Sequence, residues 1–157
     1  DRWEFFSDWA EKGEYYKTAL LNLVDADTRA FNKILTAFGL PKSTDEEKKI
    51  RKQAIQDATK EAIDVPFQVM LLAYNSMEVI EAMVAEGNPN SITDAGVGAL
   101  CARTAVMGAY MNVCINTADY DDKAYVADII ARGKAIQQQT TDREAAILKR
   151  IHAHIGG

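Results

Sequence analysis

The stretch of sequence that decides the fold runs from Leu20 to Phe38 and reads LLNLVDADTRAFNKILTAF. Large apolar residues recur in it at intervals of three, four or seven positions, which is typical of one buried helix face. The apolar residues on this stripe are Leu20, Val24, Phe31, Ile34 and Phe38. Asp27 lies on the same stripe, three positions after Val24 and four before Phe31. Because burying an unpaired carboxylate is costly, we expect an inward-facing Asp27 to have a function.

The remainder of the chain also shows helical patterns, and its glycines and prolines are spaced as helix boundaries. We expect a short amphipathic piece over residues 3–10 that weakens near Gly13. Longer helices should cover about 14–38, 44–63, 66–86, 91–116 and 121–155, with Pro66 opening a new helix. Length and composition fit one domain. The sequence therefore predicts an all-α, single-domain bundle of about five long helices over residues 1–157, with no sheet.

Two segments are typical of helix N-termini with capping boxes. Ser43 and Thr44 each stand three positions before a glutamate, and Ser91 stands three positions before Asp94. The helix expected after Ser91 is rich in alanine and glycine. Glycine costs about 1 kcal/mol per site against alanine within a helix, so we expect a neighbouring backbone or a ligand to approach this helix closely.

Composition and charge exclude several classes of function. A formal net charge of -5 argues against nucleic-acid partners and acidic membrane surfaces. No apolar run approaches the roughly 18 residues of a membrane span, and the charged start does not resemble a signal peptide. Cys101 and Cys114 fit a reduced, cytoplasmic protein. With only His152 and His154 besides, we predict no metal site.

Several phrases of the sequence occur in a recognisable order. They are Leu23–Asp27, Leu40–Lys42 followed by Asp45–Glu47, Val65–Pro66, Gly87–Asn88 through Ser91 and Asp94, and Gly108–Asn116. In this ordered set, from about Lys17 onward, the chain resembles the cyclodeaminase domain of formiminotransferase-cyclodeaminase. That family also includes bacterial methenyltetrahydrofolate cyclohydrolases. The family's N-terminal helix, with its glycine-rich, serine-containing segment, has no match here, nor does the formiminotransferase domain. Since the chain lacks an initiator methionine, we expect it to begin partway into a longer gene product.

The resemblance implies a cytoplasmic formimidoyltetrahydrofolate cyclodeaminase, an ammonia-lyase of one-carbon metabolism and histidine degradation. Such an enzyme converts 5-formiminotetrahydrofolate into 5,10-methenyltetrahydrofolate and ammonia, with no cofactor besides the tetrahydrofolate substrate. This chemistry needs a proton shuttle and a rigid pocket that excludes water. Asp27 matches the position of the family's catalytic acid/base. The resemblance further implies a homodimer or higher homo-oligomer with pockets near the subunit interface, and a separate formiminotransferase as a candidate partner.

Four further residues are candidate substrate contacts. Asn112 and Asn116 are one helical turn apart, and their amides suit the mixed donor and acceptor edge of a pterin ring. Alternatively they form helix-to-helix hydrogen bonds, or Asn116 caps its helix. Ser91 and Asp94 form a capping pair or, as the alternative, lie beside the ligand. Asp27 is alternatively a buried structural carboxylate paired with a lysine, an arginine or a helix end.

The residues leave two points open. The anionic glutamyl tail of a folate favours a nearby cation, and nothing in their spacing chooses among Lys17, Lys33, Lys42 and Arg103. The function is alternatively that of a methenyltetrahydrofolate cyclohydrolase, or of a non-catalytic helical module in assembly or regulation. Small-residue helix faces and a long final helix favour self-association in each case.

Overall fold

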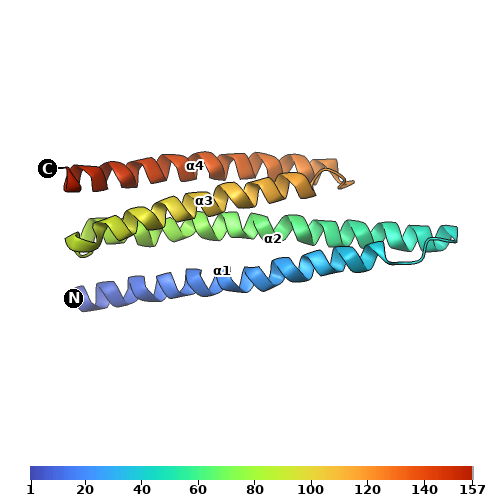
Figure 1. Ribbon diagram of the computed structural model, residues 1–157, viewed down its shortest axis with the longest axis horizontal. Coiled ribbons are helices and arrows are strands. Elements are labelled where there is room, and N and C mark those ends of the chain that lie inside the picture. Colours follow the sequence, from blue (N-terminus) through green and yellow to red (C-terminus); the bar gives the residue numbers. More distant parts are fainter. Residues whose placement is uncertain (157) are drawn as a thin grey trace.

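The computed structural model describes residues 1–156, which form four long helices and, within that range, no strand. The elements are α1 (Arg2–Phe38), α2 (Asp45–Glu86), the 3-10 turn η1 (Pro89–Ser91), α3 (Ile92–Asn116) and α4 (Lys123–Ile155). Successive helices run antiparallel in an elongated bundle, and both ends of the chain lie at the same end of it (Figure 1). The predicted all-α class is confirmed, and the predicted count of five long helices is wrong.

Two predicted boundaries are absent because neighbouring helices hold α1 and α2 straight through them. α1 continues past Gly13, and α2 continues past Pro66. An internal proline removes one helical hydrogen bond and usually breaks an isolated helix. Here Val65, Pro66 and Phe67 are all buried. Burial of the Val65 and Phe67 side chains stabilises by about 1.5–3 kcal/mol each, which offsets the local cost.

α2 is the central helix of the bundle. Its main contacts are with α1 on one side and with α3 and α4 on the other, and α3 packs further against α4. Most of the core therefore lies among α2, α3 and α4, where its largest fully buried side chains are Ile63, Met70, Met77, Val106 and Val113. Because α1 and α3 both pack on α2 with no comparable contact between them, a groove runs between α1 and α3 with α2 as its floor.

The face that α1 turns toward α2 differs from the predicted one. Leu23, Ala30 and Ala37, seven positions apart, are buried, whereas Val24 and Phe31 are exposed. Small side chains let two helices approach closely, so the alanine row packs on α2 and the large residues remain at its edge. Asp27 shares their edge and is exposed in the single chain. The prediction that Asp27 faces the core is therefore wrong.

One of the two predicted capping boxes is present. The Thr44 side chain accepts from the Glu47 backbone N–H at 3.1 Å, and Glu47 accepts in return from Thr44 and Ser43. These backbone donors lower the pKa of Glu47. At the start of α3, Ser91 is the N-cap residue but its side chain makes no capping hydrogen bond. The predicted capping pair of Ser91 and Asp94 is therefore wrong.

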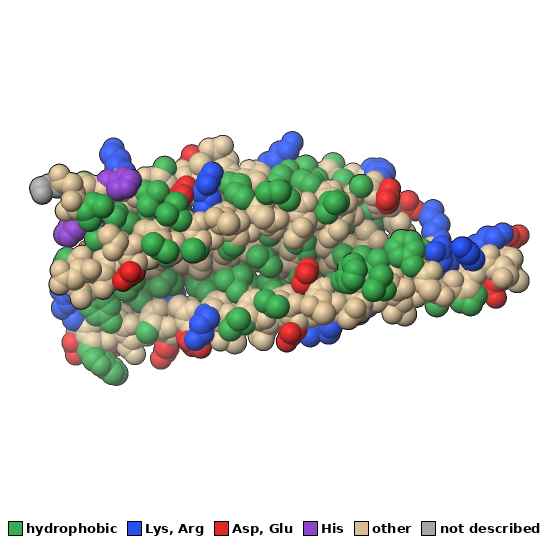
Figure 2. All heavy atoms as spheres, in the orientation of Figure 1, with side chains coloured by type: hydrophobic (Ala, Val, Ile, Leu, Met, Phe, Trp, Pro, Cys, Tyr) green, Lys and Arg blue, Asp and Glu red, His purple; other side chains and the backbone are tan. Residues whose placement is uncertain are grey.

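The outward face of α3 is unusually apolar. Its exposed residues include Val97, Leu100, Met111 and Ile115, which follow one another at helical spacing and which we call the α3 stripe. Hydrophobic side chains line the depression between α3 and α1 in Figure 2. The segment Pro89–Asn116 is long and apolar enough to cross a membrane by length and composition, with a mean hydropathy of 1.2 over an 18-residue window. Core helices of water-soluble proteins meet the same measures when they are mostly buried, whereas only 22% of this window is buried within the chain. A single helix of this kind is weak evidence for a membrane span.

Candidate functional site

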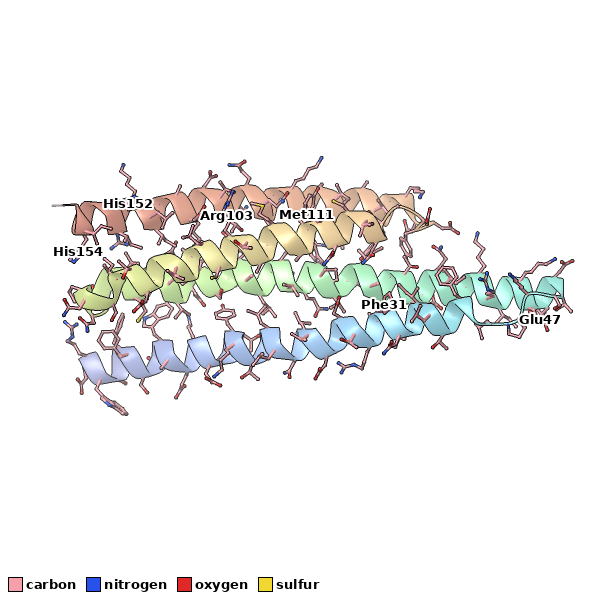
Figure 3. The ribbon with its side chains drawn as sticks, viewed as in Figure 1. Phe31, Glu47, Arg103, Met111, His152 and His154 are labelled. Carbon is pink, nitrogen blue, oxygen red and sulfur yellow. The ribbon has the colours of Figure 1, made fainter. Side chains whose placement is uncertain are left out.

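A pocket of about 200 Å³ lies in the groove between α1 and α3. Seven residues line it: Asp27, Ala30, Phe31 and Ile34 of α1, Ala62 of α2, and Asn112 and Asn116 of α3. Three of the five residues predicted as site residues are among them. They come from two helices that are separated by the whole of α2 in sequence. Phe31, labelled on α1 in Figure 3, supplies the one aromatic wall of this pocket.

Asp27 lies at the edge of this pocket. It is exposed, and it forms no ion pair with any other residue in the range 1–156. The alternative of a buried, paired structural carboxylate is therefore wrong for the single chain. A carboxylate without an ion pair among the described residues, on an otherwise apolar face, is available for chemistry with a bound molecule.

The two asparagines differ in what holds them. The Asn116 side chain donates from Nδ2 to the carbonyl oxygen of Ala62 at 2.7 Å, so it forms the helix-to-helix hydrogen bond that was its alternative role. Asn112 is exposed, and its side-chain amide bonds to no group of residues 1–156. The pocket therefore has one fixed amide and one free amide, a helical turn apart.

Ser91 and Asp94 lie in a different place. Both line a larger and mostly apolar cavity of about 680 Å³ at the other end of α3, between the N-terminal turns of α1 and the end of α2. Phe6 and Met83 contribute to its walls. The structure thus separates the five predicted site residues into two groups, and Ser91 and Asp94 do not contribute to the pocket that contains Asp27.

Three of the four candidate cations for a glutamyl tail already have carboxylate partners. Lys17 pairs with Glu14 at 2.6 Å and Lys33 with Glu61 at 2.6 Å. Arg103 Nε lies 3.2 Å from a Glu144 oxygen, close enough for an ion pair but without the alignment of a hydrogen bond. Within residues 1–156, only Lys42 of the four candidates has no such partner.

Two further polar contacts join α2 to α4. Arg143 forks onto both oxygens of Glu81 at 2.6 and 2.7 Å, and Tyr125 donates to Asp64. Burial and this hydrogen bond raise the pKa of Tyr125. Across residues 1–156, no group of three or more His, Cys, Asp or Glu side chains is placed to hold a metal ion. The predicted absence of a metal stays a prediction.

Sequence reasoning missed the contribution of α2 to the pocket. Ala62 offers a backbone carbonyl there, and a carbonyl has no signal of its own in a sequence. The available signal was Pro66, which stands four positions later and cannot donate to that carbonyl. Phe31 was also misplaced, because its regular spacing made it a candidate for the core.

Comparison with known proteins adds three findings. Residues 1–135 match the protein family described as formiminotransferase-cyclodeaminase. A methenyltetrahydrofolate cyclohydrolase from Methylorubrum extorquens is 37% identical over 118 residues, which cover 75% of this chain and 57% of that protein. A formimidoyltransferase-cyclodeaminase from Sus scrofa is 35% identical over 134 residues, which cover 85% of this chain and 25% of that protein.

A solved structure shares the fold. The crystal structure of formiminotetrahydrofolate cyclodeaminase from Thermotoga maritima superposes with a TM-score of 0.76, over 90% of this chain and 67% of that chain. The sequence identity is 22%, so the likeness extends to the helical architecture alone.

Proposed function

This chain belongs to the formiminotransferase-cyclodeaminase family, and we propose that it acts as a formimidoyltetrahydrofolate cyclodeaminase. In this proposal it converts 5-formiminotetrahydrofolate into 5,10-methenyltetrahydrofolate and ammonia. One observation carries the proposal. Asp27, Asn112 and Asn116 were selected on sequence grounds alone, and the fold brings all three to one pocket from two different helices. The Sus scrofa relative, by its name, has the same activity.

The pocket supplies what ring closure requires. The formimino group enters as its protonated amidinium ion, N5–CH=NH2⁺. N10 of the folate attacks its carbon, and the carboxylate of Asp27 takes the proton from N10. The resulting carboxylic acid returns that proton to the amino nitrogen, which leaves as ammonia while the methenyl cation forms, so protons and charge balance. A positioned acid/base of this kind contributes about 10²- to 10⁴-fold in rate. The pocket volume of about 200 Å³ is below the roughly 300–1,000 Å³ of typical ligand pockets, so in this proposal only the reacting end of the folate enters it and the tail lies outside.

Water exclusion must come from an additional cover, because Asp27 is exposed in the single chain. We propose that a second copy of this chain provides the cover, in a homodimer that contacts the α3 stripe. Met111, labelled in Figure 3, is 66% exposed and Ile115 is 72% exposed, and both stand beside the pocket residue Asn112. Apolar residues exposed to this degree along one face are typical of an interface.

The dimer proposal is tested by measuring molar mass with light scattering coupled to size exclusion. The unsubstituted protein should have twice its chain mass, and Met111→Glu should shift it toward the monomer because a charge would be buried without a partner. Ala135→Glu, on an exposed face of α4, is the matched control and should remain dimeric. A monomeric unsubstituted protein, or a dimer that tolerates Met111→Glu, contradicts this interface.

The second candidate function is that of a methenyltetrahydrofolate cyclohydrolase, which the Methylorubrum extorquens relative favours by its name and its 37% identity. Parallel assays separate the two functions. A cyclodeaminase releases ammonia from 5-formiminotetrahydrofolate while methenyl absorbance grows, whereas a cyclohydrolase consumes 5,10-methenyltetrahydrofolate and the absorbance falls. Turnover of neither substrate, with no folate binding by calorimetry, would leave the third reading, a non-catalytic helical module.

The proposal has three further parts that rest on the resemblance. The enzyme uses no cofactor besides the folate, works in the cytoplasm, and receives its substrate from a formiminotransferase that is a separate protein or a further domain. Ammonia release from purified protein without any additive tests the first part. Fractionation of cells and co-purification test the other two.

A further inference from the structure

The carbonyl oxygen of Ala62 is an unusual group, because the covalent structure of the chain removes its helical partner. In a regular α-helix this oxygen accepts from the backbone N–H of residue 66. Residue 66 is a proline, which has no N–H, and its ring also crowds the carbonyl four positions earlier. α2 nevertheless continues through this point from Asp45 to Glu86. The Ala62 oxygen is therefore released from the hydrogen-bond ladder of α2.

This released carbonyl faces the pocket and is used there. Ala62 lines the pocket together with Asn116, and Asn116 Nδ2 donates to the Ala62 oxygen at 2.7 Å. A buried backbone carbonyl without a donor would cost free energy, so the asparagine replaces the N–H that proline lacks. Pro66 and Asn116 stand on different helices and are 50 positions apart in the chain.

The hydrogen bond to Ala62 also fixes the orientation of the Asn116 side-chain amide. Only the nitrogen of a side-chain amide donates, so Nδ2 faces Ala62. The oxygen, Oδ1, is consequently a fixed acceptor that bonds to no group of residues 1–156. Asn112, one turn earlier on α3, has no such restraint, since its exposed amide bonds to nothing in the same range.

We infer that Pro66 is a positioning residue of the pocket. It frees the Ala62 carbonyl to hold the Asn116 amide, and the amide then presents Oδ1 to an N–H group at the reacting end of a bound folate. The role of the folate rests on the proposed function, whereas the hydrogen-bond arrangement does not. Preorganised acceptors of this kind improve binding because their orientation costs nothing when the ligand arrives.

The first arm of the test examines the arrangement without any folate. In a ¹⁵N-labelled sample, hydrogen exchange of the Asn116 side-chain amide is compared with that of Asn112, the two being assigned with Asn116→Ala and Asn112→Ala. In the unsubstituted protein the Asn116 amide should exchange several-fold more slowly. Pro66→Ala restores an N–H to the Ala62 carbonyl and realigns it with the helix axis, so the Asn116 amide should then exchange at the Asn112 rate. Unchanged protection in Pro66→Ala overturns the inference.

The second arm measures steady-state kinetics with 5-formiminotetrahydrofolate and with 5,10-methenyltetrahydrofolate. On whichever substrate is turned over, Pro66→Ala should raise KM about tenfold and leave kcat close to normal, as expected for loss of one hydrogen bond that holds substrate and transition state alike. In an Asn116→Ala background, Pro66→Ala should change KM no further. An equal loss in both backgrounds, or a loss in kcat alone, overturns the inference.

The exchange experiment and the kinetic experiment test different parts of the inference, so failure of the proposed function can be told apart from failure of the role of Pro66. Absence of turnover on both folates in the unsubstituted protein would remove the proposed function and the folate part of the inference, while the exchange arm would still decide the role of Pro66 in holding Asn116. Because replacing a proline within a helix favours helix formation, Pro66→Ala should fold, which circular dichroism verifies.

Discussion

Gly133 in α4 offers a stringent test of how closely α3 and α4 pack. It is buried, and a Cβ atom built on it would lie 2.7 Å from two ring carbons of Tyr110 and 3.7 Å from the terminal carbon of Met70. Carbon atoms pack best at about 3.5–4.0 Å. In Gly133→Ala the Tyr110 ring or the whole of α3 must therefore shift by roughly 1 Å. The ring has little freedom, because Tyr110 packs on the core cluster, and this burial raises the pKa of Tyr110 to about 12.

Two opposing contributions set the size of the effect. Replacing glycine by alanine within a helix stabilises by about 1 kcal/mol. Overpacking a dense core costs about 1–3 kcal/mol. The net result is a loss of about 0–2 kcal/mol in the free energy of unfolding. Because this range includes no change at all, the stability of Gly133→Ala alone does not test the packing.

Gly13→Ala is the matched comparison, because it also gains the helix propensity of alanine but does not overpack the core. Gly13 lies within α1, and its Cβ would meet only Val79, at an ordinary 3.8 Å. Gly13→Ala should therefore be about 1 kcal/mol more stable than the unsubstituted protein. Urea unfolding of both variants should place Gly133→Ala about 1–3 kcal/mol below Gly13→Ala. Equal stability of the two variants would refute the close packing of α4 on Tyr110.

Two further predictions concern the polar contacts between helices. Arg143→Lys should lower the free energy of unfolding in urea by about 1 kcal/mol, because lysine cannot bond to both Glu81 oxygens, which Arg143 reaches at 2.6 and 2.7 Å. An unchanged unfolding midpoint would show that this ion pair contributes no more than an exposed one. Glu78→Gln should change the pH dependence of stability. The Tyr16 hydroxyl and Lys12 hold the pKa of Glu78 below its usual 4.5. The contribution of the Glu78 carboxylate to the free energy of unfolding is therefore complete above pH 4.5, and it is lost as the pH falls through the lowered pKa of the folded state. The variant should be less stable than the unsubstituted protein at about pH 7, and the difference should shrink as the pH falls below 4.5. A difference that stays constant as the pH is lowered would contradict the assignment.

Hydropathy patterns and punctuation were sufficient for the helical class and for most helix ends. The capping box at Thr44 is a local arrangement whose participants stand within a few positions of one another, so the sequence contains all of it. The pairing of Asn112 with Asn116 was predictable for the same reason, since helical spacing alone places both on one face of α3. The prediction of a capping box at Ser91 was wrong: Ser91 is the last residue of η1, and its side chain makes no capping hydrogen bond.

The face of α1 could not be chosen from periodicity. Leu23, Ala30 and Ala37 repeat every seven positions, as do Val24, Phe31 and Phe38, so α1 has two adjacent rows with the same period. Hydrophobicity favours the second row, whereas close approach to α2 selects the first, and only the packing decides. The prediction that a new helix begins at Pro66 was wrong for a related reason, because tertiary contacts override the local preference of proline for a helix start.

These two errors coincide with the pocket. The exposed row of α1 presents Asp27 and Phe31, and the uninterrupted α2 presents the Ala62 carbonyl. Local rules of sequence are expected to fail at functional sites, where groups are arranged for a ligand rather than for the stability of the chain.

The most direct measurement of the central claim is ammonia release from 5-formiminotetrahydrofolate by Asp27→Asn, with Asp25→Asn as the matched control. Both aspartates are exposed on α1, and only Asp27 lines the pocket. Both variants should keep the unfolding midpoint of the unsubstituted protein. Asp27→Asn should lose about 10²- to 10⁴-fold in kcat/KM, whereas Asp25→Asn should remain close to normal. Near-normal turnover by Asp27→Asn, or an equal loss in both variants, would contradict the account.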